Sequence, residues 1–371
     1  TEIVDEIVDI KLDTTDLITK ENVMVALSNE GYIKRVSMKS YTSSNGDETT
    51  LKPGDYLKYL FEVSTLDNLV IFTNLGQYLY VPVHTIFEGK WKDLGKHINN
   101  LVTGLSESEY IVGAFILKNP EEKITFVTKN GLVKQSILKD FVVSRYSKAM
   151  LAFKLKDNDE VIAVNQSKPR TVLISEAGYY VNIDTEEIPV VGARASGVRG
   201  MNLKDDVLAA GLSLDSSEYL SIFTNNKTAK RVKVSELETH NRAKKGSTLI
   251  KKVKSFDYKI IKALLTDGKD ELFLKCDNEI TKIKNTDISI LDLKSTGGTI
   301  SRYKIDDVFT STVVDSSLKN NKDANEEVKT LEENTDKVVE EIQESEIEEK
   351  KEEKPKEEQV SLNDFFDEFK I

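Results

Sequence analysis

Cysteine and histidine are scarce in this chain. Cys276 is the only cysteine among 371 residues, so no internal disulfide can form, and a reducing compartment fits. His84, His97 and His240 stand far apart without neighbouring donor patterns, whereas a metal site needs clustered ligands. No apolar run approaches the roughly 20 residues of a membrane-spanning helix. These absences exclude a disulfide scaffold, a histidine-based metal centre and a helical membrane span.

Catalytic signatures are absent too. There is no GxxxxGK[ST] phosphate loop, and the similar AKKGST at 243–248 lacks an upstream glycine within range. Neither a GxSxG nucleophile elbow nor an HExxH pair occurs. Acidic residues are plentiful, but a charge-rich surface is usually only solvated. The sequence therefore favours a binding platform over an enzyme.

The formal net charge of −11 is unevenly distributed. Residues 318–371 contain 9 Lys against 19 Asp and Glu, a net charge of −10. The preceding 317 residues carry 43 basic and 44 acidic groups and are therefore nearly neutral. Because the tail produces the acidic balance, that balance does not argue against nucleic-acid binding by the rest of the chain.

A short pattern occurs six times between residues 23 and 288. Each copy is an apolar, β-rich run, a short polar turn and a second, alternating run, which is typical of a β-hairpin. The copies are 23–36, 69–81, 124–136, 171–183, 220–232 and 272–283. Their turns fall at Gly31, Gly76, Gly131, Gly178, Lys227 and Asn278. A period near fifty residues with several strands per copy predicts a radial array of small sheets.

Further apolar runs flank the hairpins and predict additional strands. They lie at 56–64, 110–118, 160–166, 206–214 and 259–267, with a last copy at 307–315 after the sixth hairpin. Two hairpin strands and two flanking strands make a four-stranded blade. We expect 307–315 to complete a blade whose other strands come from another repeat, because that would close the ring and remove an open edge.

These patterns predict an all-β chain in three parts. Residues 1–22 have helical spacing and are expected to enter from an upstream domain, so the chain reads as the C-terminal part of a larger polypeptide. Residues 23–315 form a six-bladed, propeller-like disc. Residues 316–371 form an acidic, mostly disordered tail.

Basic loops recur between the blades and suggest phosphate binding. The loops are 40–54, 88–100, 144–155, 192–203, 240–252 and 293–304, and most place Lys or Arg beside small residues. The candidate DNA-binding residues in these loops are Arg145, Lys148, Arg194, Arg199, Arg242, Lys244 and Lys245. Lys34-Arg35 and Lys230-Arg231 recur at one position of the hairpin and are candidates as well. The alternative is that all of them are solvated turn residues.

Several segments together resemble a known family. GYIKRVSMKSY (31–41), FTNLG (72–76), FTNN (223–226) and GARASGVRGMNL (192–203) resemble the C-terminal domain of type IIA DNA topoisomerase A subunits. The resemblance covers about residues 1–315. It implies a β-pinwheel, a disc with strands exchanged between blades, which binds duplex DNA on a basic outer rim and bends it.

One departure favours the topoisomerase IV branch of this family. The gyrase branch has a QRRGGKG box after the first hairpin, whereas 42–50 reads TSSNGDETT. The resemblance then implies a bacterial, cytoplasmic, nucleoid-associated A₂B₂ holoenzyme, in which the partners of this domain are the B subunits, the remainder of its own A subunit, and duplex DNA. ATP and Mg²⁺ would serve that holoenzyme, and this fragment would need no cofactor.

The fragment itself is expected to be non-catalytic. Arg145-Tyr146 and Arg302-Tyr303 look like the family's catalytic Arg-Tyr pair but stand in inter-blade loops without the winged-helix context. Two other functions stay open. One is the gyrase version, which wraps DNA for negative supercoiling, and the other is a propeller scaffold that binds proteins and no DNA.

The tail carries two further predictions. Its charge of −10, tethered to a DNA-binding disc, is expected to compete with DNA for the basic rim. Gln359, Leu362, Phe365 and Phe366 would share one face of a short helix. That peptide loosely resembles sliding-clamp-binding peptides, so the clamp is a candidate partner.

Overall fold

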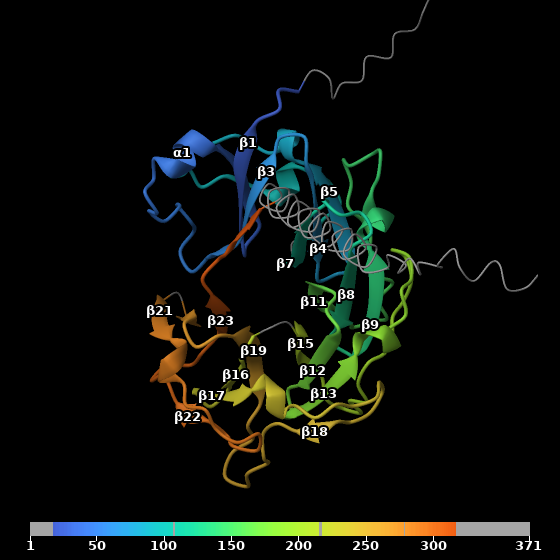
Figure 1. Cartoon of the computed structure of the whole chain (residues 1–371), viewed down its shortest axis with the longest axis vertical. Coiled ribbons are helices and arrows are strands. Elements are labelled where there is room, and N and C mark those ends of the chain that lie inside the picture. The colour runs from blue at the N-terminus through green and yellow to red at the C-terminus, as the bar shows by residue number, and fades with distance from the viewer. Residues whose placement is uncertain (1–17, 107, 215–216, 278, 317–371) are drawn as a thin grey trace, which may run out of the picture. The chain divides into compact units, whose positions relative to one another are not determined.

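Six small sheets stand around a common centre (Figure 1). The computed structural model describes residues 18–106, 108–214, 217–277 and 279–316. Each predicted hairpin supplies two strands of one blade, and the all-β, six-bladed prediction is confirmed. The hairpins are β1 (Asn22–Ser28) with β2 (Tyr32–Ser37), β4 (Asn68–Thr73) with β5 (Gln77–Pro82), β8 (Lys123–Thr128) with β9 (Leu132–Ile137), β12 (Arg170–Ser175) with β13 (Tyr179–Asp184), β16 (Tyr219–Thr224) with β17 (Thr228–Lys233), and β20 (Glu271–Cys276) with β21 (Glu279–Lys284).

Most hairpin strands are apolar on both faces because their blades pack between two others, whereas the residues of β21 are mostly exposed. In β4, Leu69 and Ile71 join the core shared with the first blade. Val70 and Phe72, which point the other way, join a second core with residues of the third blade such as Phe126. Side chains alternate across a strand, so one continuous apolar run serves two inter-blade cores. The predicted turn residue Asn278 lies outside the described residues.

The third strand of each blade is the flanking strand that follows the hairpin. These inner strands are β3 (Leu57–Ser64), β7 (Ile111–Ile116), β11 (Val161–Gln166), β15 (Leu208–Leu214), β19 (Ile260–Thr266) and β23 (Asp307–Thr310). They surround the centre of the disc in Figure 1. The prediction for 307–315 is therefore corrected in part. β23 completes the blade of its own hairpin, and only β24 (Val314–Ser316) pairs with the first blade, parallel to β3.

A short fourth strand comes back from the repeat that follows. These strands are β6 (Lys96–His97) on β2, β10 (Met150–Leu151) on β5, β14 (Val198–Arg199) on β9, β18 (Ser247–Thr248) on β13 and β22 (Gly298–Thr299) on β17. The chain thus forms one hairpin, steps back one blade to add an edge strand, and then moves forward. We call the segments 87–105, 142–155, 189–204, 238–254 and 290–304, which contain these strands, the crossover segments. The sequence predicted them as loops.

The first and last blades are joined directly. The ring of Tyr56 stacks on that of Phe309 with centroids 3.6 Å apart. The Tyr56 hydroxyl donates a hydrogen bond of 3.0 Å to Asp307, which also pairs with Lys262 at 2.7 Å. Together with the β24–β3 pairing, these contacts tie the two ends of the repeat array, so neither terminal blade is left without a neighbour.

A substitution at Gly246 would test how closely the crossover strand β18 packs against the hairpin strand β13. Gly246 precedes β18 with φ of +80°, and an added Cβ would lie 1.9 Å from the Tyr180 carbonyl oxygen. We expect Gly246→Ala to lower the free energy of unfolding by more than about 3 kcal/mol, since the left-handed conformation and the overpacking both oppose it.

Gly46 provides the matched control, because its φ is +84° and no atom lies within 4 Å of an added Cβ. Gly46→Ala should lose only the conformational part, about 1–2 kcal/mol. If urea unfolding gave equal losses of unfolding free energy for the two variants, the close packing of β18 against β13 would be contradicted.

Candidate nucleic-acid interface

The crossover segments are hydrogen-bonded to one another in series. Each contact is a hydrogen bond from a backbone N–H of one segment to a backbone carbonyl of the next. Thr103 of the first segment donates to Ser147 of the second (3.0 Å), and Lys154 of the second donates to Ala195 of the third (3.3 Å). Asn202 of the third donates to Lys244 of the fourth (2.9 Å), and Lys251 of the fourth donates to Lys294 of the fifth (3.0 Å). Because each segment also supplies an edge strand, the series follows the outer edges of five blades. We call this series the crossover band.

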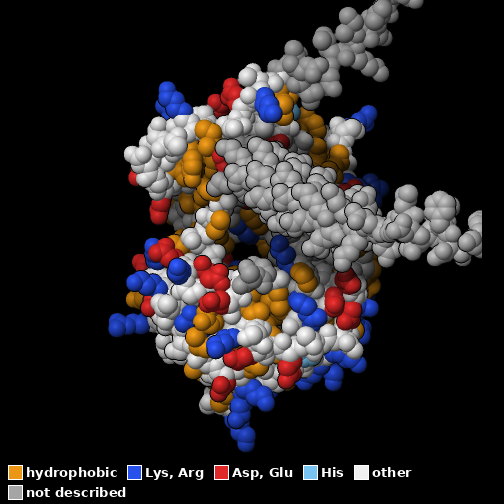
Figure 2. Space-filling model, in the orientation of Figure 1, with side chains coloured by type: hydrophobic (Ala, Val, Ile, Leu, Met, Phe, Trp, Pro, Cys, Tyr) orange, Lys and Arg blue, Asp and Glu red, His pale blue; other side chains and the backbone are white. Residues whose placement is uncertain are grey.

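Exposed cations follow the crossover band. Six predicted DNA-binding residues are exposed on it: Arg145, Lys148, Arg194, Arg199, Lys244 and Lys245. The structure adds exposed lysines that were not named as candidates, namely Lys251, Lys252, Lys254 and Lys294. Figure 2 shows Lys and Arg side chains projecting along the lower edge of the disc. Lys251 and Lys252 end a loop that was already predicted as basic, so the same signal, extended along it, would have found them.

The third and fourth segments bring cations of different blades together. The Arg242 guanidinium donates to the Arg199 carbonyl oxygen at 2.7 Å, and the Ala243 N–H donates to Gly200 at 2.7 Å. Arg242 is half-buried by this contact, and its backbone N–H donates to the Glu187 carboxylate at 2.9 Å. Arg242 therefore positions the segment, while the neighbouring Arg199 and Lys244 side chains face solvent.

Lys34 and Lys230, predicted to bind DNA, are buried instead. Their side chains are 2% and 1% exposed, and the unpredicted Lys134 is fully buried at the same hairpin position. The Lys230 ammonium donates to the carbonyls of Leu249 (2.6 Å), Leu293 (2.6 Å) and Asp292 (3.1 Å). Lys134 donates in the same way to Ala152 (2.6 Å), Ala193 (2.8 Å) and Gly192 (3.2 Å). The prediction of DNA contacts for Lys34 and Lys230 is therefore wrong.

The buried lysines recur because crossover segments leave carbonyl groups that need donors. An ammonium has three N–H donors, and a buried carbonyl without a partner costs about 1–3 kcal/mol. Lys134 and Lys230 each bridge two successive crossover segments. Lys34 bonds the Trp91 carbonyl at 2.6 Å and the Thr49 hydroxyl at 2.5 Å, because no crossover segment precedes the first blade in the described part of the chain.

Arg35 and Arg231, also predicted to bind DNA, are engaged within the protein. Arg35 pairs with Glu88 at 2.7 Å and donates to the His84 carbonyl at 3.0 Å. The Arg231 side chain donates to the Ile288 carbonyl at 2.7 Å and lies 4.8 Å from the Tyr219 ring. Both side chains therefore bond at or just before a crossover segment, since Glu88 lies within the first and Ile288 lies two residues before the fifth.

The small residues of the loops also serve packing. Gly95, Gly197 and Gly297 each precede a crossover strand, and an added Cβ would lie 2.7 Å from a hairpin carbonyl oxygen at all three. On sequence alone, such residues were expected to permit close approach to phosphate. The structure explains them by close approach of one strand to another.

The segment 38–54 covers the outer edge of the first blade. It begins with the short helix α1 (Met38–Thr42), and the indole N–H of the buried Trp91 donates to the Asp47 carbonyl at 2.7 Å. The Asp47 carboxylate pairs with Lys92 at 2.9 Å. Lys92, a cation of the first crossover segment, is thus neutralised from within the chain.

Other kinds of site find no support in the described ranges. No group of three or more His, Cys, Asp or Glu side chains there could hold a metal ion. Within the same ranges, no helix is long and apolar enough to cross a membrane. The exposed Tyr146 and Tyr303 of the two Arg-Tyr pairs both lie on crossover segments.

Strand exchange between blades and the contacts that join the first blade to the last define a six-bladed, propeller-like domain. Residues 67–118, 122–168, 171–213 and 218–267 match the family described as DNA gyrase C-terminal domain, beta-propeller. The chain belongs to this family.

Curated relatives in the family are named as A subunits of DNA topoisomerase 4. The Bacillus subtilis (strain 168) protein is 37% identical over 272 residues, which are 72% of this chain and 34% of the relative. The Staphylococcus aureus (strain MRSA252) protein is 33% identical over 268 residues, 71% of this chain and 33% of the relative. The chain therefore spans about a third of the length of these relatives.

Solved structures agree. A crystal structure of the C-terminal domain of DNA topoisomerase IV has a TM-score of 0.75 and 33% identity, covering 79% of this chain and 94% of that one. A DNA gyrase A C-terminal domain has a TM-score of 0.57 at 21% identity, covering 79% of this chain and 100% of that one, and shows the shared fold.

The buried lysines predict how stability depends on pH. Burial lowers the pKa of Lys34 and of Lys134 to about 8 and that of Lys230 to about 7, from 10.5. Above these values the folded state binds fewer protons than the unfolded state, so the free energy of unfolding should rise between pH 7 and 9.5. Each lysine contributes at most about 1.4 kcal/mol per pH unit.

Urea unfolding at a series of pH values measures this rise. Lys230→Met should reduce the slope, while Lys148→Met, at an exposed position, should leave it unchanged. A parent protein that loses stability over this pH range would contradict the lowered pKa values and would show that the protonated lysines stabilise the folded state.

Proposed function

We propose that this domain binds duplex DNA along the crossover band and bends it. The observation that carries the proposal is a continuous series of exposed cations on consecutive blades. Among the described residues, the ion pairs involve none of Arg145, Lys148, Arg194, Arg199, Lys244 and Lys245. Adjacent cations without counter-charges repel one another, and a polyanion laid along them relieves that repulsion.

The contacts are expected to go to phosphates. The described part of the crossover band has no helix that could enter the major groove, and its cations lie on short strands and turns. Phosphate contacts position a protein on DNA without reading sequence. The domain should therefore bind with little sequence preference, and its affinity should fall steeply with salt.

The domain acts, in this proposal, within a bacterial topoisomerase IV of A₂B₂ composition. The remainder of its A subunit would cleave DNA, the B subunits would bind ATP, and Mg²⁺ would serve those parts. This domain would present a DNA segment for strand passage during decatenation and relaxation, in the cytoplasm at the nucleoid. The relatives' names support the topoisomerase IV branch.

The covered first blade favours this function over DNA wrapping by gyrase. Segment 38–54 contains Asp47 and Glu48 and has no counterpart of the basic QRRGGKG box. Lys92 of the first crossover segment is paired to Asp47, whereas the exposed Lys90 and Lys96 of the same segment take part in none of the ion pairs among the described residues. Segment 38–54 thus lowers the positive charge of the first blade where the gyrase branch has a basic box, and this favours a shorter DNA track than a gyrase wrap.

Charge reversal on the crossover band should weaken DNA binding. We expect Arg194→Glu with Arg199→Glu to raise the Kd for a short duplex at least tenfold at low salt and to flatten the salt dependence, because about two phosphate contacts are lost. Lys118→Glu with Lys123→Glu is the matched control, since both side chains are exposed but lie outside the crossover segments. Equal binding by both double variants, with unchanged melting temperatures, would move the DNA site elsewhere.

The reconstituted holoenzyme should relax and decatenate DNA with ATP but should not introduce net negative supercoils. The physical reason is the covered first blade. Gel analysis of a relaxed plasmid measures the outcome, with catenated circles as the positive control for activity. Net negative supercoiling would transfer the chain to the gyrase function.

Two predictions concern residues 317–371, which lie outside the described residues. One is that the acidic tail competes with DNA, and the other is that the terminal peptide binds the sliding clamp. Both stay predictions. Deleting 318–371 should tighten DNA binding, and more so at low salt, if the tail competes for the same cations.

A further inference from the structure

The fourth crossover segment leads into a turn that differs from those after the second and third segments. After the crossover strand, the second segment continues through Lys156-Asp157-Asn158-Asp159 and the third through Lys204-Asp205-Asp206, which are short and polar. The fourth continues through residues 251–259, KKVKSFDYK, which is longer, has four lysines among nine residues and contains the apolar Val253 and Phe256. We call residues 251–259 the apolar-tipped loop.

Two apolar side chains are exposed together on this loop. Val253 and Phe256 form an antiparallel bridge, and their side chains are 40% and 38% exposed. Isolated apolar residues are common on surfaces, but a paired Val and Phe surrounded by Lys251, Lys252 and Lys254 is not a solvated turn. The other exposed aromatic residues on the band are Phe87, whose ring lies 4.6 Å from the Lys96 ammonium, and Tyr146 and Tyr303, whose hydroxyl groups suit them to water.

The base of the loop is held in place. Asn225 accepts from Lys259 N–H at 2.9 Å and donates to the Asp257 carbonyl at 3.1 Å. The Tyr258 hydroxyl accepts from Asn226 at 2.9 Å, and its ring lies 5.0 Å from that of Phe256 in an edge-to-face arrangement. The apolar tip is thus presented by a fixed base, which lowers the entropy lost when the tip meets a ligand.

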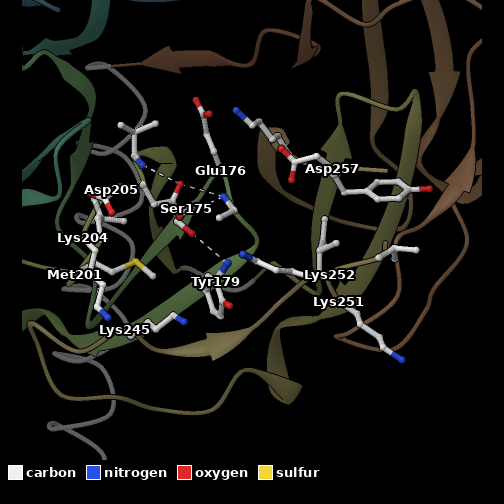
Figure 3. Close-up of a pocket in the computed structure, with 18 of the residues that line it drawn as sticks. Ser175, Glu176, Tyr179, Met201, Lys204, Asp205, Lys245, Lys251, Lys252 and Asp257 are labelled. Carbon is white, nitrogen blue, oxygen red and sulfur yellow. Dashed lines mark hydrogen bonds between the residues drawn. The ribbon is translucent and has the colours of Figure 1, made fainter. Parts of the chain in front are cut away.

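A basic cleft lies next to the apolar tip. Its volume is about 660 Å³, and it separates the apolar-tipped loop from the turn before β15. Six lysines line it: Lys204, Lys245, Lys251, Lys252, Lys254 and Lys259. Lys245 lies 4.0 Å from the Tyr179 ring, and in Figure 3 Lys252 points across the cleft toward Tyr179 whereas Lys251 points away. Four carboxylates also line the cleft, and one of them, Asp206, is engaged by the Ala177 N–H.

We propose that Val253 and Phe256 form an apolar wedge that enters a groove of bound duplex DNA and partly unstacks one base step. The inference rests on the proposed DNA-binding function and assigns the place and the means of bending. Apolar side chains that enter between base steps kink DNA by about 20–90°, provided that nearby cations hold the flanking phosphates. Val253 and Phe256 line the same cleft as the six lysines, which supply those cations.

Fluorescence of a short duplex tests the wedge in the full-length chain. The duplex carries 2-aminopurine, which brightens when unstacked, and a donor–acceptor pair at its ends reports bending. Binding of the parent chain should raise the 2-aminopurine signal severalfold and bring the ends closer. Phe256→Ala should abolish the rise and reduce the bend, while the Kd rises by less than about tenfold and the salt dependence is kept.

Matched variants separate wedge, charge and folding. Phe256→Leu keeps an apolar tip and should retain most of the signal. Leu66→Ala shortens an apolar side chain of similar exposure, 42%, away from the band and should change nothing. Lys252→Gln with Lys254→Gln should weaken binding and lower the salt dependence while the bound duplex still unstacks. Unchanged melting temperatures are expected throughout, because these side chains are exposed.

Distinct outcomes overturn the wedge and the DNA-binding function. Salt-dependent binding by the parent without a 2-aminopurine rise, or a full rise with Phe256→Ala, overturns the wedge alone. A parent chain that does not bind the duplex at low salt overturns both. Phe256-dependent binding to anionic phospholipid vesicles, with no effect of Phe256 on the duplex, reassigns the tip to a membrane surface and overturns the wedge.

Discussion

Strand exchange between neighbouring blades is the constraint on which the rest of the structure depends. A hairpin with one inner strand would leave its outer strand with unpaired N–H and C=O groups. In five blades a two-residue strand from the following repeat pairs with that edge. To reach it, each crossover segment must pass over the rim and pack against the hairpin backbone. The rim therefore consists of segments that hydrogen bonds to the hairpins hold in place, and this fixes the spacing of its side chains.

The same constraint divides the basic residues into two groups. Carbonyl groups of the crossover segments turn inward and need donors, and buried lysines such as Lys134 and Lys230 supply them. Side chains that point outward from the same segments, including Arg199 and Lys244, are exposed to solvent. Lysine and arginine thus hold the rim together from inside and charge it from outside. Charge along the chain alone does not distinguish the two roles.

The first blade shows what happens where no crossover segment precedes a hairpin in the described part of the chain. Thr49 of segment 38–54 bonds Lys34 in place of such a segment. In doing so the segment lies over the first crossover segment, where Asp47 pairs with Lys92. A packing requirement at the first blade therefore also removes one cation, Lys92, from those that a polyanion could contact there.

The hairpins, the inner strands and the number of blades could be predicted from sequence, because alternation, apolar runs and turn residues are local and recur with one period. The two-residue crossover strands could not be predicted, since they are too short to show a sequence pattern. They form only because the outer strand of the preceding blade has an unpaired edge. Several exposed cations of the rim were among the residues predicted from composition, whereas Lys34 and Lys230 are buried, and Arg35 and Arg231 make contacts within the protein. Sequence determined which residues carry charge and which recur. Only the tertiary structure decided which of those charges meet carbonyl groups and which meet solvent, because that depends on segments far apart along the chain.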